Sequence, residues 1–162
     1  MDYRAQHLIE VVSFHARPQS DKPEDQLFKA HQHAKAHDLY KEYLTNKAYL
    51  SAYTIAFSLL EDRLRAMAIV KQRDVLKGDG YRVFITQGIA RVIGFVYDKT
   101  PENSFLIQNL KNAAINRNKF MHEAMWRTDA ITQIDVEHVM NLQGIVKNDL
   151  DKMKRKLKKK ID

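Results

Sequence analysis

The chain of 162 residues has no cysteine, only five glycines and three prolines, and no long uninterrupted apolar run. Without cysteine it forms neither disulfides nor thiolate–metal sites, and this composition suits a reducing compartment. Because glycine and proline are the commonest residues of turns, their scarcity predicts a mostly helical chain with short connections. The length fits one domain with a real hydrophobic core.

Membrane spans and targeting signals are also missing from the sequence. Charged residues interrupt every apolar stretch well before the ~20 residues that a membrane-spanning helix needs. The first residues show no basic segment followed by an apolar core. We therefore expect a cytoplasmic protein that does not contact a membrane.

The net charge of +7 is concentrated near the C-terminus, where residues 147–162 carry eight Lys or Arg and three Asp. This segment is a candidate for binding RNA phosphates, with an affinity that salt lowers. The residues concerned are Lys152, Lys154, Arg155, Lys156 and Lys158. One alternative is a solvated helix end whose lysines complement the helix dipole. Another is a basic amphipathic helix on an anionic membrane, although the segment has no aromatic anchor.

Two long helices are predicted in the first half of the chain. The first runs from about Pro23 to Thr45, because proline suits the first turn of a helix and Ser20 or Asp21 can cap it. The second runs from about Lys47 to Arg73. Its apolar residues recur at three- and four-residue steps, which predicts one buried face. They are Leu50, Tyr53, Phe57, Leu60, Leu64 and Met67.

Three more helices are predicted after the turn signal at residues 77–80. The third covers about residues 81–97 and contains two glycines. The fourth begins at Thr100 and Pro101 and runs to about Trp126. The fifth opens with a capping-box pair, Thr132 and Asp135, and runs from about Gln133 to Lys160.

The fold class predicted from these elements is all-α, a compact four- to five-helix bundle that runs roughly up and down. Residues 1–24 are a short extension that favours extended structure slightly, residues 25–151 form the bundle, and residues 152–162 are the basic helical tail. No internal repeat is visible.

The most informative stretch lies in the fourth predicted helix, where Arg117, Asn118 and His122 occur together. Asn118 and His122 are four residues apart and therefore share one helix face. Arg117 falls on the apolar stripe of this helix, so it leans toward the edge of the core, with Asn118 and His122 facing outward beside it. Lys119 is a further candidate for phosphate contact. The apolar stripe is Leu106, Leu110, Ala113, Ala114, Met121 and Ala124.

An arginine on an apolar stripe needs a partner, because burying an unpaired charge is costly. Glu61 and Asp62 of the second predicted helix are the candidate partners for Arg117. The structural alternative for the whole motif is that Arg117 pairs with a carboxylate for stability and His122 lies on a polar surface.

The pattern Arg117-Asn118-x-x-x-His122, late in a helical bundle, resembles the signature of the HEPN superfamily. The stretch from Glu61 to Arg65 resembles that family's Glu-x-x-Leu-Arg pattern. The resemblance covers roughly residues 25–152. It implies a helical homodimer in which the Arg/His motifs of both subunits face one cleft. It also implies a metal-independent endoribonuclease without cofactors, often a toxin neutralised by an antitoxin or an effector of anti-phage defence.

The chemistry that follows is cleavage of RNA by its own 2′-OH, a group that DNA lacks. His122 would act as general base or acid, since an imidazole titrates near neutral pH. Arg117 would stabilise charge on the phosphate, and Asn118 would position the phosphate or the imidazole. One family subgroup carries a tyrosine two residues after the histidine, which a partner nucleotidyltransferase modifies. Ala124 stands there, so the sequence departs from that subgroup.

A second group of candidates is His31, His33 and His37. His33 and His37 are four residues apart, a spacing that can bind a metal from one helix face. Lys35 and Ala36 stand where helical zinc proteases have their acidic residue, so we favour a solvated or interface cluster and expect no metal site.

Two functions follow from the sequence. The first is an endoribonuclease, acting on RNA as a homodimer and controlled by an antitoxin or another regulatory protein. The second is a non-catalytic helical module that binds RNA or a partner protein.

Overall fold

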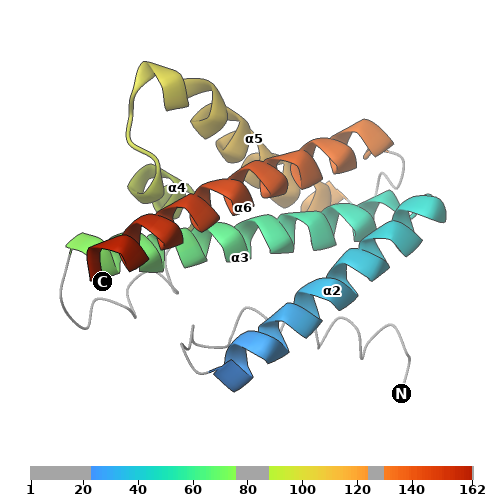
Figure 1. The fold of residues 1–162 in the computed structure, drawn as a ribbon. Coiled ribbons are helices and arrows are strands. Elements are labelled where there is room, and N and C mark those ends of the chain that lie inside the picture. Colours follow the sequence, from blue (N-terminus) through green and yellow to red (C-terminus); the bar gives the residue numbers. More distant parts are fainter. Residues whose placement is uncertain (1–22, 76–87, 124–129, 162) are drawn as a thin grey trace.

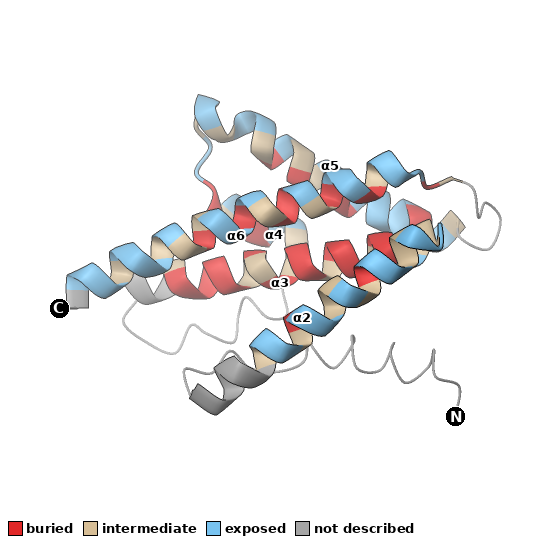
Figure 2. Ribbon diagram, turned by 45° about the vertical axis from the view of Figure 1, so that its right-hand side comes forward, coloured by how far each residue is buried: buried red, intermediate tan, exposed pale blue. Residues whose placement is uncertain are grey.

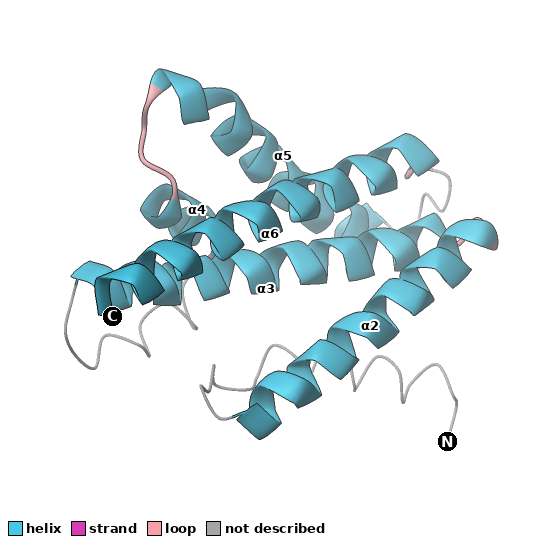
Figure 3. Cartoon of the chain, viewed as in Figure 1, coloured by secondary structure: helices cyan, strands magenta, loops and turns pink. Residues whose placement is uncertain are grey.

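The computed structural model describes residues 23–75, 88–123 and 130–161, and the side chains of residues 29–71, 88–123 and 130–160. The described residues form helices, turns and loops, without a strand (Figures 1 and 3). The helices are α2 (Pro23–Thr45), α3 (Tyr49–Val75), α4 (Ile89–Val96), α5 (Pro101–Glu123) and α6 (Gln133–Ile161). The prediction of an all-α compact bundle is confirmed.

The helix α3 is the centre of the bundle, since it contacts each of α2, α4, α5 and α6. Figure 2 shows buried positions along most of α3, whereas the outer sides of α2 and α6 are exposed. The sequence pattern predicted one buried face on this helix, and that prediction was too narrow. Ala52, Ile55, Ala66 and Ile69 lie outside the predicted stripe and are also buried. A helix that is apolar on most sides is stable only when other helices surround it.

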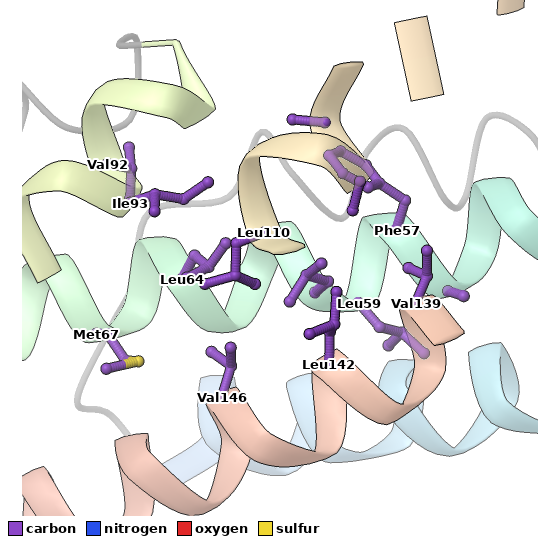
Figure 4. Packing of buried hydrophobic residues seen from close by; sticks show 14 of the residues in the cluster. Phe57, Leu59, Leu64, Met67, Val92, Ile93, Leu110, Val139, Leu142 and Val146 are labelled. Carbon is purple, nitrogen blue, oxygen red and sulfur yellow. The ribbon is translucent and has the colours of Figure 1, made fainter. Parts of the chain in front are cut away.

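The core joins α3 to α6 through the most extensive helix–helix contact in the described chain. Figure 4 shows Val139, Leu142 and Val146 of α6 lying against Leu59 and other apolar side chains of α3. Each fully buried side chain of this size contributes about 1.5–3 kcal/mol through removal of its surface from water. This contact places α6 in a defined register along α3.

The start of α6 follows the predicted capping box. The backbone N–H of Thr132 donates to Asp135 Oδ2 at 2.8 Å, and the Asp135 N–H donates to Thr132 Oγ1 at 3.3 Å. The two residues thus satisfy each other's backbone donors, which have no partner within the helix. The start of α5 at Pro101 also agrees with the prediction.

One boundary differs from the sequence prediction. Gly88 was expected inside the third predicted helix, but it precedes α4 in the structure. The fifth predicted helix, from about Gln133 to Lys160, agrees with α6, which continues through the basic tail, where Met153 and Leu157 pack against the core. The features predicted for residues 1–22, the turn at residues 77–80 and the helical residues 81–87 and 124–126 lie outside the described residues.

No helix in the described ranges combines the length and the apolarity needed to span a membrane.

Candidate functional site

The last turns of α5 are held against α3 by an aromatic contact and a hydrogen bond. The Tyr53 hydroxyl donates to the backbone carbonyl of Ala113 at 3.0 Å. The Tyr53 ring meets the Phe120 ring edge-on, with 5.1 Å between centroids. Both Tyr53 and Phe120 are buried. These contacts set the rotation of α5 and therefore decide which of its residues reach the surface.

Arg117 lies on the α3 side of α5, with its guanidinium 5.7 Å from the centre of the Phe57 ring. Its Nη1 donates to Asn118 Oδ1 at 3.0 Å. Both residues are exposed. An arginine over an aromatic face keeps much of its hydration while its position is restrained. The Arg117–Asn118 pair therefore presents a cation and an amide to solvent together.

His122 is exposed one helical turn beyond Asn118, and Lys119 is exposed between them. The predicted grouping of Asn118 and His122 on the outer side of the helix agrees with this exposure. Among the described residues, the His122 imidazole has no hydrogen-bond partner. Ile115 and Met121 flank the motif and are 62% and 52% exposed, which is unusual for large apolar side chains. The surface around the motif is therefore partly apolar.

The apolar stripe of α5 differs from the prediction at its end. Met121 was expected to be buried, but Phe120 is buried and Met121 is exposed. The cause is the rotation set by Tyr53, whose ring packs on Phe120. Ala124, at the end of the predicted stripe, lies outside the described residues.

Neither predicted carboxylate partner holds Arg117. The Glu61 carboxylate accepts a hydrogen bond from Arg65 Nη2 at 2.6 Å, within the same helix. Asp62 points to α2 instead, where it meets Lys29. Asp62 is five residues from Phe57, which is about 140° around a helix, so it faces away from α5. Arg65, four residues after Glu61, is a closer partner than a residue on another helix.

Asp62 is the centre of a polar network buried between α2 and α3. Its Oδ2 lies 3.1 Å from Lys29 Nζ and 3.1 Å from His33 Nε2. His33 Nδ1 accepts a hydrogen bond from Arg63 Nη2 at 2.9 Å. Burial by itself would raise the pKa of Asp62, but the hydrogen bond from His33 and the charge of Lys29 outweigh it and hold the pKa below its ordinary value. Burial lowers the pKa of His33, and the neighbouring Arg63 cation acts in the same direction.

The three histidines predicted as a cluster have different surroundings. His33 is buried in the α2–α3 network, His37 is half-buried, and His31 is exposed. Burial lowers the pKa of His37, with further contributions from His33 and Arg63. Across the described ranges, no three His, Asp or Glu side chains are grouped as a metal site would require. Of the two alternatives expected for this cluster, solvated or interface, His33 lies in an interface, the one between α2 and α3, whereas His31 is exposed to solvent.

The basic residues of the tail lie on the exposed surface of the last turns of α6. Lys152 Nζ lies 3.6 Å from Asp149 Oδ1, and Arg155 Nε donates to the backbone carbonyl of Asp151 at 3.2 Å. Met153 and Leu157 face the core and orient this part of the helix. The exposed basic residues predicted to bind RNA are Lys152, Lys154, Arg155, Lys156 and Lys158.

The chain was compared with protein-family models, curated proteins and solved structures, and none of them matches.

Sequence reasoning missed two features of these sites. Phe57 was assigned to the core, and its ring also supports the Arg117 guanidinium. The network of Lys29, His33 and Arg63 was missed although Glu61-Asp62-Arg63 follows the apolar pair Leu59-Leu60 on a helix that is otherwise largely apolar. A carboxylate and a guanidinium within a largely apolar helix are the signal that could have revealed this polar network, since buried charges require partners.

Proposed function

We propose that this protein is a metal-independent endoribonuclease that cleaves RNA through attack by the RNA's own 2′-OH. The observation that carries the proposal is the exposure of Arg117, Asn118 and His122 together at the end of α5, with Arg117 bonded to Asn118 at 3.0 Å. The pattern of these residues resembles the HEPN signature. On this basis the protein acts in the cytoplasm as a toxin or as an effector of anti-phage defence.

In the proposed reaction, the His122 imidazole removes the proton from the 2′-OH. The 2′-oxygen then bonds to the adjacent phosphorus, and the bond from phosphorus to the 5′-oxygen of the next nucleotide breaks. A protonated imidazole or water supplies the proton that the leaving oxygen takes up. The products carry a 2′,3′-cyclic phosphate and a 5′-hydroxyl.

Arg117 stabilises the negative charge that develops on the phosphate oxygens, because its planar guanidinium presents parallel N–H donors. Asn118 restrains Arg117 through its Oδ1. Its amide N–H groups are then directed toward the phosphate. Lys119 is exposed beside them and adds a second positive charge for the RNA backbone.

A homodimer with a composite site fits the surface around the motif. Ile115 and Met121 leave apolar area exposed on both sides of Asn118 and Lys119. Covering such area in a symmetric interface is favourable and would bring two copies of His122 toward one cleft. One imidazole would then serve as base and the other as acid. An antitoxin or another regulatory protein would act by covering the same face.

The deciding experiment is cleavage of a labelled RNA in EDTA by the wild-type protein, His122→Ala and His138→Ala, with analysis of the new 3′ ends. His138 is exposed on α6 outside the motif, so its replacement controls for the loss of a surface histidine. We expect cyclic phosphate ends from the wild type and His138→Ala, and none from His122→Ala. Equal cleavage by all three proteins would contradict the proposal.

One observation favours a second function, a non-catalytic module that binds RNA or a partner protein. Among the described residues, the His122 imidazole has no hydrogen-bonded group that would orient it, whereas a catalytic base is usually held by a third group. In that case RNA binding would survive in His122→Ala, and neither protein would cleave RNA.

A further inference from the structure

Arg63 is a half-buried cation on α3. Its Nη2 donates to His33 Nδ1, and its buried Nε has no hydrogen-bond partner among the described residues. No carboxylate of the described chain lies within ion-pair distance of its guanidinium. Burial lowers the pKa of Arg63, while the charges of Asp62 and Asp151 act against this. A buried arginine donor without an acceptor costs free energy and calls for an explanation.

The nearest carboxylate is already occupied. Asp62 Oδ2 accepts from both Lys29 and His33 at 3.1 Å. Because Arg63 donates to His33 Nδ1, the imidazole must carry its proton on Nε2 and be neutral. Asp62 therefore accepts hydrogen bonds from two donors, and it interacts with Arg63 only through its charge.

Positive charge from α6 adds to this excess. Lys154 acts electrostatically on Lys29, Lys147 acts on His37, and Asp151 acts on Arg63. Lys147 and Lys154 are exposed. Lys41, which is exposed on α2, also acts on His37. Five cations and two carboxylates from α2, α3 and α6 therefore interact electrostatically with this network. The cations come from three separate parts of the sequence, so the excess positive charge is not confined to the C-terminal tail.

We propose that Arg63, Lys29, Lys147 and Lys154 form a binding site for a phosphate group at the junction of α2, α3 and α6. A phosphate would accept hydrogen bonds from the Arg63 guanidinium and would balance the excess positive charge. The lysines would reach the ligand from the exposed side of the junction.

This site differs from the Arg117 motif in position. Arg63 follows Phe57 by six residues on α3, which is about 9 Å along the helix and about 120° around it. The two sites therefore lie on different sides of α3, in agreement with the opposite positions of α2 and α5 about that helix (Figure 1). The source of the phosphate is the RNA backbone, which rests on the proposed function, or a small phosphorylated molecule.

The test compares Arg63→Gln, Lys154→Gln and Lys99→Gln, each in full-length protein carrying His122→Ala so that RNA stays intact. Glutamine at position 63 keeps an N–H donor for His33 and removes the charge. Lys154 is exposed, so its replacement does not threaten the fold. Lys99 is exposed between α4 and α5 and provides a control with the same charge change. The probes are a labelled single-stranded RNA, followed by fluorescence anisotropy at several salt concentrations, and inorganic pyrophosphate, followed by calorimetry.

We expect Arg63→Gln to weaken binding about tenfold, as for loss of a charged hydrogen bond. Lys154→Gln should reduce the salt dependence of RNA binding by about one phosphate contact. Weaker RNA binding assigns the site to backbone phosphate, and weaker pyrophosphate binding alone assigns it to a small phosphorylated ligand. Binding unchanged relative to Lys99→Gln, or no binding of either probe by the parent protein, overturns the proposal. If Arg63→Gln fails to fold, the comparison of Lys154→Gln with Lys158→Gln decides, because Lys158 is exposed on the tail and is not part of the proposed site.

Binding and cleavage are measured separately, so the two proposals can fail separately. A protein that binds phosphate at this junction without cleaving RNA contradicts the endoribonuclease and keeps the phosphate site. If cleavage is lost in His122→Ala while Arg63→Gln and Lys154→Gln bind the probes normally, the endoribonuclease stands and the phosphate site is contradicted.

Discussion

Replacing Asp62 with alanine should be among the most damaging single changes in the α2–α3 interface. Asp62 is only 5% exposed and is the common acceptor for Lys29 and His33. Its removal leaves a partly buried ammonium and a buried imidazole N–H without their carboxylate. Arg63 then keeps only the charge of Asp151 as compensation.

The expected loss follows from the two contacts at 3.1 Å. Hydrogen bonds to a charged group contribute about 1.5–3 kcal/mol each, and breaking a buried ion pair costs about 3–5 kcal/mol. The Lys29 side chain is 30% exposed, so water replaces part of its lost interaction. We therefore expect Asp62→Ala to lower the free energy of unfolding by about 3 kcal/mol. Asp62→Asn keeps an oxygen acceptor and should lose about half as much.

The assay is urea unfolding followed by circular dichroism, with the free energy obtained by linear extrapolation. The control is Asp98→Ala, because Asp98 pairs with Lys71 at 3.1 Å while its own side chain is 80% exposed. Surface pairs of this kind contribute at most about 1 kcal/mol. An Asp62→Ala protein as stable as Asp98→Ala would refute the account of Asp62 as the centre of the interface.

Four further predictions concern stability and use the same unfolding measurement. Because burial lowers the pKa of His33 from 6.5, the unfolded chain binds protons first as the pH falls, so stability should be full above pH 6.5 and fall below it. The lowered pKa of Asp62 extends this loss to more acid pH. A stability profile that is flat between pH 7 and 5, which is about the range where histidine titrates, would contradict the prediction. Tyr53→Phe removes the 3.0 Å hydrogen bond to α5 and should cost about 1–2 kcal/mol, and no loss would show that the bond is dispensable. Gln143→Met should stabilise by about 1 kcal/mol, because Gln143 is 3% exposed and its Nε2 has no hydrogen-bond partner in the described part of the chain; destabilisation would argue against an unsatisfied donor. Lys47→Gly should stabilise by about 0.5 kcal/mol, because relief of the strain at φ 56° exceeds the entropy that glycine adds to the unfolded chain, and a loss of stability would reverse that balance.

Local sequence patterns determined the helices themselves. Each of these patterns acts on residues only a few positions away in the chain. They are the scarcity of glycine and proline, the capping pair Thr132 and Asp135, and the proline at position 101. Their effect therefore does not depend on how the helices pack. For this reason the start of α5, the start of α6 and the span of α2 agree with the prediction.

The tertiary structure decided which partners the functional residues have. Arg117 lies over Phe57, and Asp62 turns to Lys29 and His33, because the rotation of α5 and the crossing of α2 over α3 set these contacts. Periodicity shows which face of a helix is apolar, but it carries no information on which other helix covers that face. Whether a charged side chain finds a partner depends on contacts between residues far apart in the chain, and these exist only once the helices have packed.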